Sequence, residues 1–180
     1  MHRSRKVALV AHCLLNVNAR VEGLATYEGV HPLVGALADR GYGIVQLPCP
    51  EMMAEGGHRE PRPVEAYDTP VFNELCAALA EDAVAQVGRH LKAGDSVELF
   101  VGIEGSPSCG VGVTNVSAGD GVWCSGRPMT RVPGCGVLTR ALRERLVPLG
   151  VMFTAVDNRD RDLGLSRVLL AIDDPAAPDA

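Results

Sequence analysis

The sequence predicts an α/β fold with a mainly parallel central sheet and helices on both faces. Short apolar runs alternate with longer helical segments along the 180 residues, and hydrophobic residues make up 47% of the chain, enough for a substantial core. Strands that alternate with helices form right-handed crossover units, which require a parallel sheet covered on both sides. In such a Rossmann-like fold, sites form outside the carboxyl ends of the strands.

Eight segments are predicted to be regular elements. The predicted strands are four short apolar runs near residues 6–12, 43–48, 97–103 and 151–156. The predicted helices lie at residues 31–41, 69–94, 134–150 and 159–172. The signals are clearest in the longest helix, where Thr69 can cap the helix, Pro70 fits its first turn and Gly94 can end it.

The remaining segments are predicted loops within one domain. Residues 51–68 are rich in glycine, proline and charge, and residues 113–129 are turn-rich with room for a small hairpin. No repeat or linker divides the sequence, so residues 1–180 are predicted to form a single domain. Its core is expected at about 6–172, with a flexible tail from residue 173.

Composition limits the kinds of partner. A net charge of −5 argues against a broad nucleic-acid surface, and no run approaches the ~18 apolar residues of a membrane span. The N-terminal segment lacks the pattern of a signal peptide, so the expected location is the cytoplasm, where thiols stay reduced. Six cysteines in that compartment indicate metal binding or catalysis more than disulfides. The sequence leaves the oligomeric state open.

Three of the cysteines stand at strand ends. Cys13 follows the first predicted strand, Cys49 follows the second, and Cys109 lies a few residues past the third. If these strands are neighbours, the three sulfurs meet at one rim of the sheet. They could then be ligands of a zinc ion, ligands of an iron–sulfur cluster, or include a cysteine nucleophile. Spacing alone leaves these alternatives open.

Four sequence blocks carry a family resemblance. They are CLLNVNARVEG (13–23), CPE with the following GG and PRPVEA (49–66), SPSCG (106–110) and PGCGVLTRAL (133–142). Together they resemble signatures of the thiouracil desulfidase family, the TudS-like iron–sulfur desulfidases. The second and third blocks are the most specific, and the four occur in order over most of the chain.

The resemblance implies a 4Fe–4S cluster held by Cys13, Cys49 and Cys109, with one iron left without a protein ligand. The sulfur of a thiocarbonyl heterocycle, such as a thiouracil-type base, would bind this open iron, and water would replace the sulfur with release of sulfide. Family-matched positions make Glu51 the catalytic acid/base and Ser106 the catalytic hydroxyl. The implied partner is therefore a small thiolated molecule.

The sequence departs from the family pattern at Asn16, Val21 and Glu22, where the family has glycine, tyrosine and aspartate. These positions are expected to border the pocket and to affect the choice of substrate. Two other functions remain open. A cluster-bound sulfide could make the protein a sulfur-donating enzyme, although no G-x-x-x-x-G-K-S/T nucleotide-binding loop is present. The chain could also be a non-enzymatic metal-binding or redox-sensing module.

The other cysteines have structural interpretations. Cys76 falls on the apolar face of the predicted helix 69–94 and is expected to pack in the core. Cys124 lies in the turn-rich segment and is given no role. Cys135 stands between two glycines at a helix start, where it either borders the pocket or packs against the fold.

Basic side chains in the segment 51–68 also have two interpretations. Arg59 and Arg62 either bind an acidic or phosphate-bearing substrate or tie down their own loop through Glu60 or Glu65. His58 either contacts the substrate or is a solvated loop histidine. Only the position of each side chain relative to the cysteines can decide between these alternatives.

Overall fold

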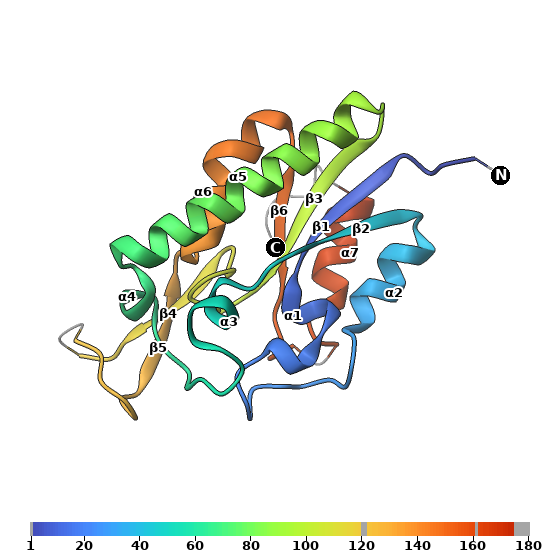
Figure 1. Cartoon of the computed structure of the whole chain (residues 1–180). Helices are drawn as coiled ribbons and strands as arrows, with labels where there is room; N and C mark the ends of the chain where they lie inside the picture. Colours follow the sequence, from blue (N-terminus) through green and yellow to red (C-terminus); the bar gives the residue numbers. More distant parts are fainter. Residues whose placement is uncertain (1, 120–121, 161, 175–180) are drawn as a thin grey trace.

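The central sheet has four strands in the order β2–β1–β3–β6 (Figure 1). The computed structural model describes residues 2–119, 122–160 and 162–174. The strands are β1 (Lys6–Ala11), β2 (Tyr42–Leu47), β3 (Ser96–Ile103) and β6 (Met152–Val156). All three pairings between them are parallel, so the predicted strands and the predicted parallel sheet are confirmed.

Helices cover both faces of this sheet. Figure 1 shows α5 (Pro70–Lys92) and α6 (Val137–Leu146) together on one side, and α2 (Pro32–Asp39) and α7 (Leu165–Asp173) on the other. The layers enclose a core of aliphatic side chains around Phe100, which is fully buried in β3. The Rossmann-like α/β prediction is therefore confirmed.

The longest helix, α5, begins and ends where its sequence signals place it. The Thr69 hydroxyl accepts a hydrogen bond from the Phe72 backbone N–H at 3.3 Å, and Pro70 occupies the first turn. The chain leaves the helix through Gly94, whose φ of 79° suits a residue without a side chain. Cys76 lies on the buried face of the helix, so its predicted core position is confirmed.

The predicted loop at residues 51–68 is wrong in part. The segment contains two short helices, α3 (Pro50–Glu55) and α4 (Val64–Tyr67). Pro50 is suited to the first position of a helix, and Glu51 stands in the first turn, where a negative charge interacts well with the free N–H groups. These helices are too short to give a helical pattern of their own, and the surrounding glycine and proline residues therefore predict a loop.

The last helix begins later than the predicted segment 159–172. It starts at Leu165, because the Asp162 carboxylate binds the backbone ahead of it: this side chain accepts hydrogen bonds from the N–H groups of Gly164 at 3.1 Å and Ser166 at 2.8 Å. Such side-chain bonds to nearby backbone compete with the helix and fix its start.

The predicted hairpin is present. Strands β4 (Val113–Ser117) and β5 (Met129–Pro133) pair in antiparallel fashion. Within their connection, residues 120–121 lie outside the described residues, as do residues 175–180 of the predicted tail. The predicted helix 134–150 comprises α6 and a short 3₁₀ turn, η2 (Val147–Leu149).

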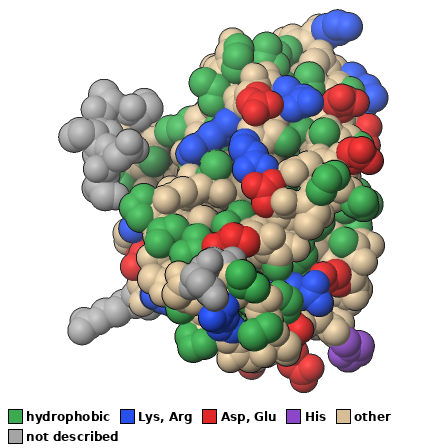
Figure 2. All heavy atoms as spheres, turned by 90° about the vertical axis from the view of Figure 1, so that its left-hand side faces the viewer, with side chains coloured by type: hydrophobic (Ala, Val, Ile, Leu, Met, Phe, Trp, Pro, Cys, Tyr) green, Lys and Arg blue, Asp and Glu red, His purple; other side chains and the backbone are tan. Residues whose placement is uncertain are grey.

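The surface around this hairpin carries mixed charge. Figure 2 shows the side of the molecule that holds β4, β5 and α4, where acidic and basic side chains lie among one another. The residues drawn in colour form no extended area of one sign on this face. Across the described ranges, the structure has no helix that is both long and apolar enough for a membrane span.

The loop that follows β3 packs closely against two glycines. A Cβ atom on Gly102, within β3, would lie 2.0 Å from the carbonyl oxygen of Cys109. A Cβ atom on Gly136, at the start of α6, would lie 2.3 Å from the carbonyl carbon of Ser108. Close approach also lets the Thr139 N–H of α6 donate to the Ser108 carbonyl at 3.1 Å. Backbone contacts on both sides thus hold this loop in place.

Replacement of Gly136 tests this packing. Gly136→Ala is expected to lower the free energy of unfolding by about 1–3 kcal/mol, because the added methyl group overlaps backbone that can only move with the whole loop. Gly88→Ala is the control. A Cβ atom on Gly88, near the C-terminal end of α5, has no neighbour within 4 Å, so alanine is expected to stabilise the helix by about 0.5–1 kcal/mol. Urea denaturation measures both, and equal stability of the two variants would contradict the packing argument.

Candidate functional site

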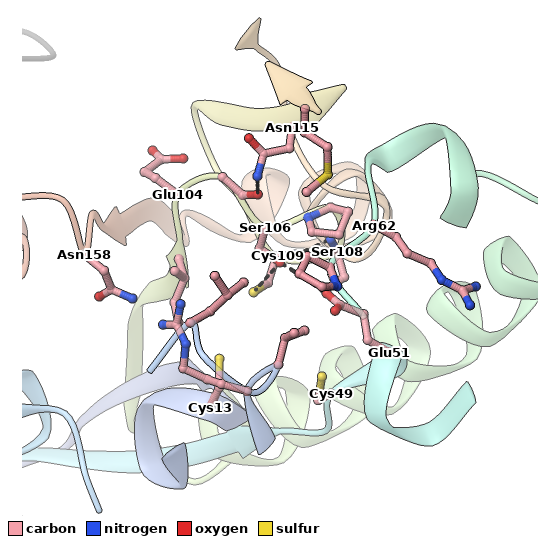
Figure 3. Close-up of a pocket in the computed structure, with 18 of the residues that line it drawn as sticks. Cys13, Cys49, Glu51, Arg62, Glu104, Ser106, Ser108, Cys109, Asn115 and Asn158 are labelled. Atoms are coloured by element: carbon pink, nitrogen blue, oxygen red, sulfur yellow. Dashed lines mark hydrogen bonds between the residues drawn. The ribbon is translucent and has the colours of Figure 1, made fainter. Parts of the chain in front are cut away.

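The carboxyl ends of three neighbouring strands carry the three predicted ligands. Cys13 lies in α1 (His12–Leu15) directly after β1, Cys49 precedes α3 after β2, and Cys109 lies in the loop after β3. All three line one cavity of about 310 Å³. In Figure 3, Cys13 and Cys49 point into this cavity from one side and Cys109 lies across from them. Parallel strand order therefore brings together residues that are far apart in the sequence.

The three thiols influence one another. A hydrogen bond with Cys109, reinforced by burial, raises the pKa of the Cys13 thiol. The same contact lowers the pKa of Cys109, and a hydrogen bond with Ser106 adds to this, although burial opposes the shift. Burial, and after it the charge of Glu51, raises the pKa of Cys49 to about 12. Since thiolates are the metal-binding form, these thiols lose their protons when a metal binds.

The donor set fits an iron–sulfur cluster. In the described parts of the chain, no three His, Cys, Asp or Glu side chains are arranged to hold a single metal ion. A cluster has a different requirement, because each of its cysteine ligands binds a separate iron atom. Three cysteine sulfurs around one cavity provide this arrangement. Among the described residues, the other three cysteines lie outside the cavity lining, so this donor set would leave one iron of such a cluster open.

Glu51 is a buried carboxylate that faces the same cavity. Its Oε1 atom accepts a hydrogen bond from the Ser108 hydroxyl at 2.5 Å and a longer one from the Ser106 hydroxyl at 3.4 Å (Figure 3). The side chain is only 9% exposed, so these bonds replace those that water would make. Contact between α3 and the loop after β3 therefore depends on this carboxylate.

Ser106 is held by the backbone of its own loop. Its Oγ atom accepts hydrogen bonds from the N–H groups of Ser108 at 3.2 Å and Cys109 at 3.1 Å. It lies 3.3 Å from the Cys109 sulfur. Because the backbone occupies its acceptor side, the hydroxyl proton is directed towards Glu51 or Ser108, and the oxygen stays next to the predicted ligand.

Ser108 is a site residue that the sequence reasoning missed. It lies in the SPSCG block, and its side chain is almost fully buried in direct contact with Glu51. The two residues are 57 positions apart, so no local spacing links them. A second serine next to the predicted ligand was the available signal.

Arg59 and Arg62 have different positions. Arg59 is buried and pairs with Glu51, with its Nε atom 3.3 Å from Oε2, so the expected tie through Glu60 or Glu65 is wrong for this residue. Arg62 does pair with Glu60, at 4.0 Å, and also with Glu55. Figure 3 shows the Arg62 guanidinium pointing away from the three sulfurs.

The remaining candidates lie outside the cavity. Cys135 is partly buried at the start of α6 and Cys124 is exposed, and neither lines the cavity. His58 is exposed and lies in a second, shallow depression beside Arg62. The interpretations that leave these side chains out of the site agree with these positions.

Only one of the three departures from the family pattern borders the cavity. Val21 lines it, as expected. Asn16 instead caps the short 3₁₀ turn η1 (Val17–Ala19), where its side chain accepts a hydrogen bond from the Asn18 N–H at 3.1 Å. Glu22 is exposed and lies outside the lining residues. The expectation that Asn16 and Glu22 border the pocket is therefore wrong.

The far end of the cavity is polar. Arg131 and Asp157 line it and form two parallel hydrogen bonds, of 3.1 and 2.6 Å. Burial favours the neutral acid, but the bonds from Arg131 hold the pKa of Asp157 below its usual range. Asn158 and Arg20 also line this end, and the Asn158 amide oxygen accepts from the Arg20 guanidinium at 3.0 Å. These residues were not predicted from the sequence, because they come from three separate segments of the chain.

Comparisons with known proteins identify the family of this chain. One relative, the uncharacterized protein MJ0003 of Methanocaldococcus jannaschii, is 37% identical over 111 residues, which cover 61% of this chain and 70% of the relative. A solved structure of the 4Fe–4S-dependent thiouracil desulfidase TudS aligns with a TM-score of 0.50 and 26% identity, over 91% of this chain and 99% of that one. The family model described as "Putative 2-thiouracil desulfurase" matches residues 5–125. This chain therefore belongs to that 2-thiouracil desulfurase family.

Proposed function

We propose that this protein is an iron–sulfur-dependent desulfidase that removes sulfur from a thiocarbonyl heterocycle, such as a thiouracil-type base, and releases sulfide. One observation carries the proposal: three cysteines and the Glu51 network line the same cavity. The structural similarity to TudS, a 4Fe–4S-dependent thiouracil desulfidase, supports it.

Cys13, Cys49 and Cys109 would hold the 4Fe–4S cluster. When bound, the cluster supplies an iron without a protein ligand, a soft Lewis acid suited to the sulfur of a thiocarbonyl group. The reaction replaces C=S with C=O: one water molecule enters, and hydrogen sulfide leaves without any change of oxidation state. The protein must therefore position water and move protons.

Glu51 and Ser106 are the side chains proposed for proton transfer. Glu51 Oε1 takes a proton from the attacking water, and the Ser106 hydroxyl relays a proton to the departing sulfur, which it can reach because it lies beside Cys109. Ser108 holds the Glu51 carboxylate in place from the side of the loop. Each role uses an atom that lines the cavity or contacts a lining residue.

The cavity favours a small substrate. A volume of about 310 Å³ is at the lower end of the range for ligand pockets and suits a single heterocyclic ring. The polar far end, with Arg131 and Asn158, offers hydrogen bonds to ring nitrogen and oxygen atoms. We place the reaction in the cytoplasm, where thiols stay reduced, and assign residues 1–180 to one domain.

Iron and sulfide content tests the cluster. Anaerobically reconstituted protein is expected to bind about four irons and four sulfides. Cys13→Ser, Cys49→Ser and Cys109→Ser are each expected to lose the cluster, because serine removes a thiolate ligand. Cys76→Ala is the matched control, since this buried thiol lies in the core and outside the cavity. Stoichiometric zinc without sulfide would contradict the cluster assignment and favour a different metal site.

Sulfide release from 2- or 4-thiouracil tests the chemistry. Glu51→Gln and Ser106→Ala are expected to keep the cluster but to lose ~10²–10⁴-fold in turnover, the usual contribution of a general acid or base. Normal turnover by both variants would remove these residues from the mechanism. Loss of the cluster would mean that they are structural. Incubation of the wild-type protein with sulfide and uracil distinguishes a sulfur-donating enzyme, which would form thiouracil.

A further inference from the structure

Arg59 connects both ends of α3 to the η1 turn through one buried guanidinium. Its side chain is only 4% exposed. Its Nε atom donates to Glu51 Oε2 at 3.3 Å, its Nη2 atom to the Ala19 carbonyl at 2.8 Å, and its Nη1 atom to the Gly56 carbonyl at 3.1 Å. A buried arginine with each nitrogen bonded is fixed in orientation, because its planar fork cannot turn without losing several bonds.

The same guanidinium reaches a predicted ligand. Arg59 Nη2 lies 3.9 Å from the Cys49 sulfur, within the range of an N–H···S hydrogen bond. Ala19, which shares this nitrogen, ends the η1 turn in the loop that begins at Cys13. Arg59 thus joins the loop after β1 to the ligand after β2.

The positive charge of Arg59 lies next to both a carboxylate and a predicted ligand. Of the acidic side chains in the described residues, Glu51 is the one in ion-pair contact with Arg59. Glu51 in turn accepts from Ser108, in the loop that carries Cys109. The guanidinium therefore contacts the loops after β1 and β2 directly and the loop after β3 through Glu51. Its positive charge stands beside the Cys49 sulfur, which becomes a thiolate when iron binds.

We propose that Arg59 is a positioning residue with two separable effects: its fork fixes the Glu51 carboxylate, and its charge and N–H group raise the reduction potential of a cluster bound through Cys49. The inference rests on the proposed function, because it requires a cluster. Hydrogen bonds to ligand sulfurs and nearby positive charge both favour the reduced form of an iron–sulfur cluster.

Two substitutions separate the effects. Arg59→Gln removes the charge and is expected to shift the reduction potential of the cluster to a more negative value. Arg59→Lys keeps the charge but not the fork, so its potential is expected to stay closer to that of the wild type. Both variants are expected to lose about 10–100-fold in kcat with little change in KM, because Glu51 loses its partner while the cavity stays open. Redox titration followed by electron paramagnetic resonance gives the potential, and sulfide release gives kcat and KM.

Arg62→Gln is the matched control. Arg62 lies in the same segment and also borders the cavity, but its charge is directed to Glu55 and Glu60 and away from the sulfurs (Figure 3). Arg62→Gln removes the same positive charge. If it shifts the reduction potential as much as Arg59→Gln does, the potential depends on the net charge near the site and not on the contact between Arg59 and Cys49. That result would overturn the proposal.

The outcomes distinguish this inference from the proposed function. Wild-type protein that binds no cluster would contradict both. A wild-type cluster whose potential is unchanged in Arg59→Gln, or kcat that is unchanged in Arg59→Lys, would overturn the role of Arg59 alone. If Arg59→Gln binds no iron, the kcat of Arg59→Lys tests the positioning role instead. A kcat equal to that of the wild type contradicts this role, and a lower kcat at unchanged iron content supports it. Hydrogen exchange in metal-free protein adds an independent readout, since both variants are expected to lose protection in residues 17–23.

Discussion

The buried carboxylate of Glu51 is the contact on which the arrangement of the site depends. It stands at the start of α3, two residues after the predicted ligand Cys49. It accepts a 2.5 Å hydrogen bond from Ser108, which is adjacent to the predicted ligand Cys109. A buried charge is tolerated only when partners replace water, and Arg59 and Ser108 do so here. These contacts fix α3 and the loop after β3 relative to each other, whereas the sheet alone only brings them near. The serines and the cysteine sulfurs then face a common cavity.

This geometry joins fold and proposed chemistry. A parallel sheet delivers Cys13, Cys49 and Cys109 to one edge, but the strands alone do not orient the sulfurs. Glycine at position 102 lets the loop backbone lie directly against β3, which turns Cys109 into the cavity. Serine hydroxyls in the same loop then serve two purposes, since they satisfy Glu51 and remain next to a sulfur. The serines that hold the loop are thus placed next to the residues of the proposed chemistry.

Much of the fold could be predicted because its signals are local. Strand lengths follow from apolar runs, and the ends of α5 follow from Thr69 and Gly94. The helices of residues 50–67 were missed because long-range contacts support them, such as the hydrogen bond from Tyr67 in α4 to Glu55 in α3 at 3.2 Å. In the site, strand ends indicated where the cysteines meet, whereas the partners of Glu51 come from distant positions that no spacing connects. The ligand and catalytic roles remain predictions.

Diffraction from anaerobically grown crystals at the iron absorption edge tests the central claim most directly. We expect a four-iron anomalous signal, with three irons bonded to the sulfurs of Cys13, Cys49 and Cys109. The fourth iron should face Glu51 and Ser106 without a protein ligand. A single-atom peak at the three cysteines, or iron bonded to Cys135 in place of one of them, would contradict the account.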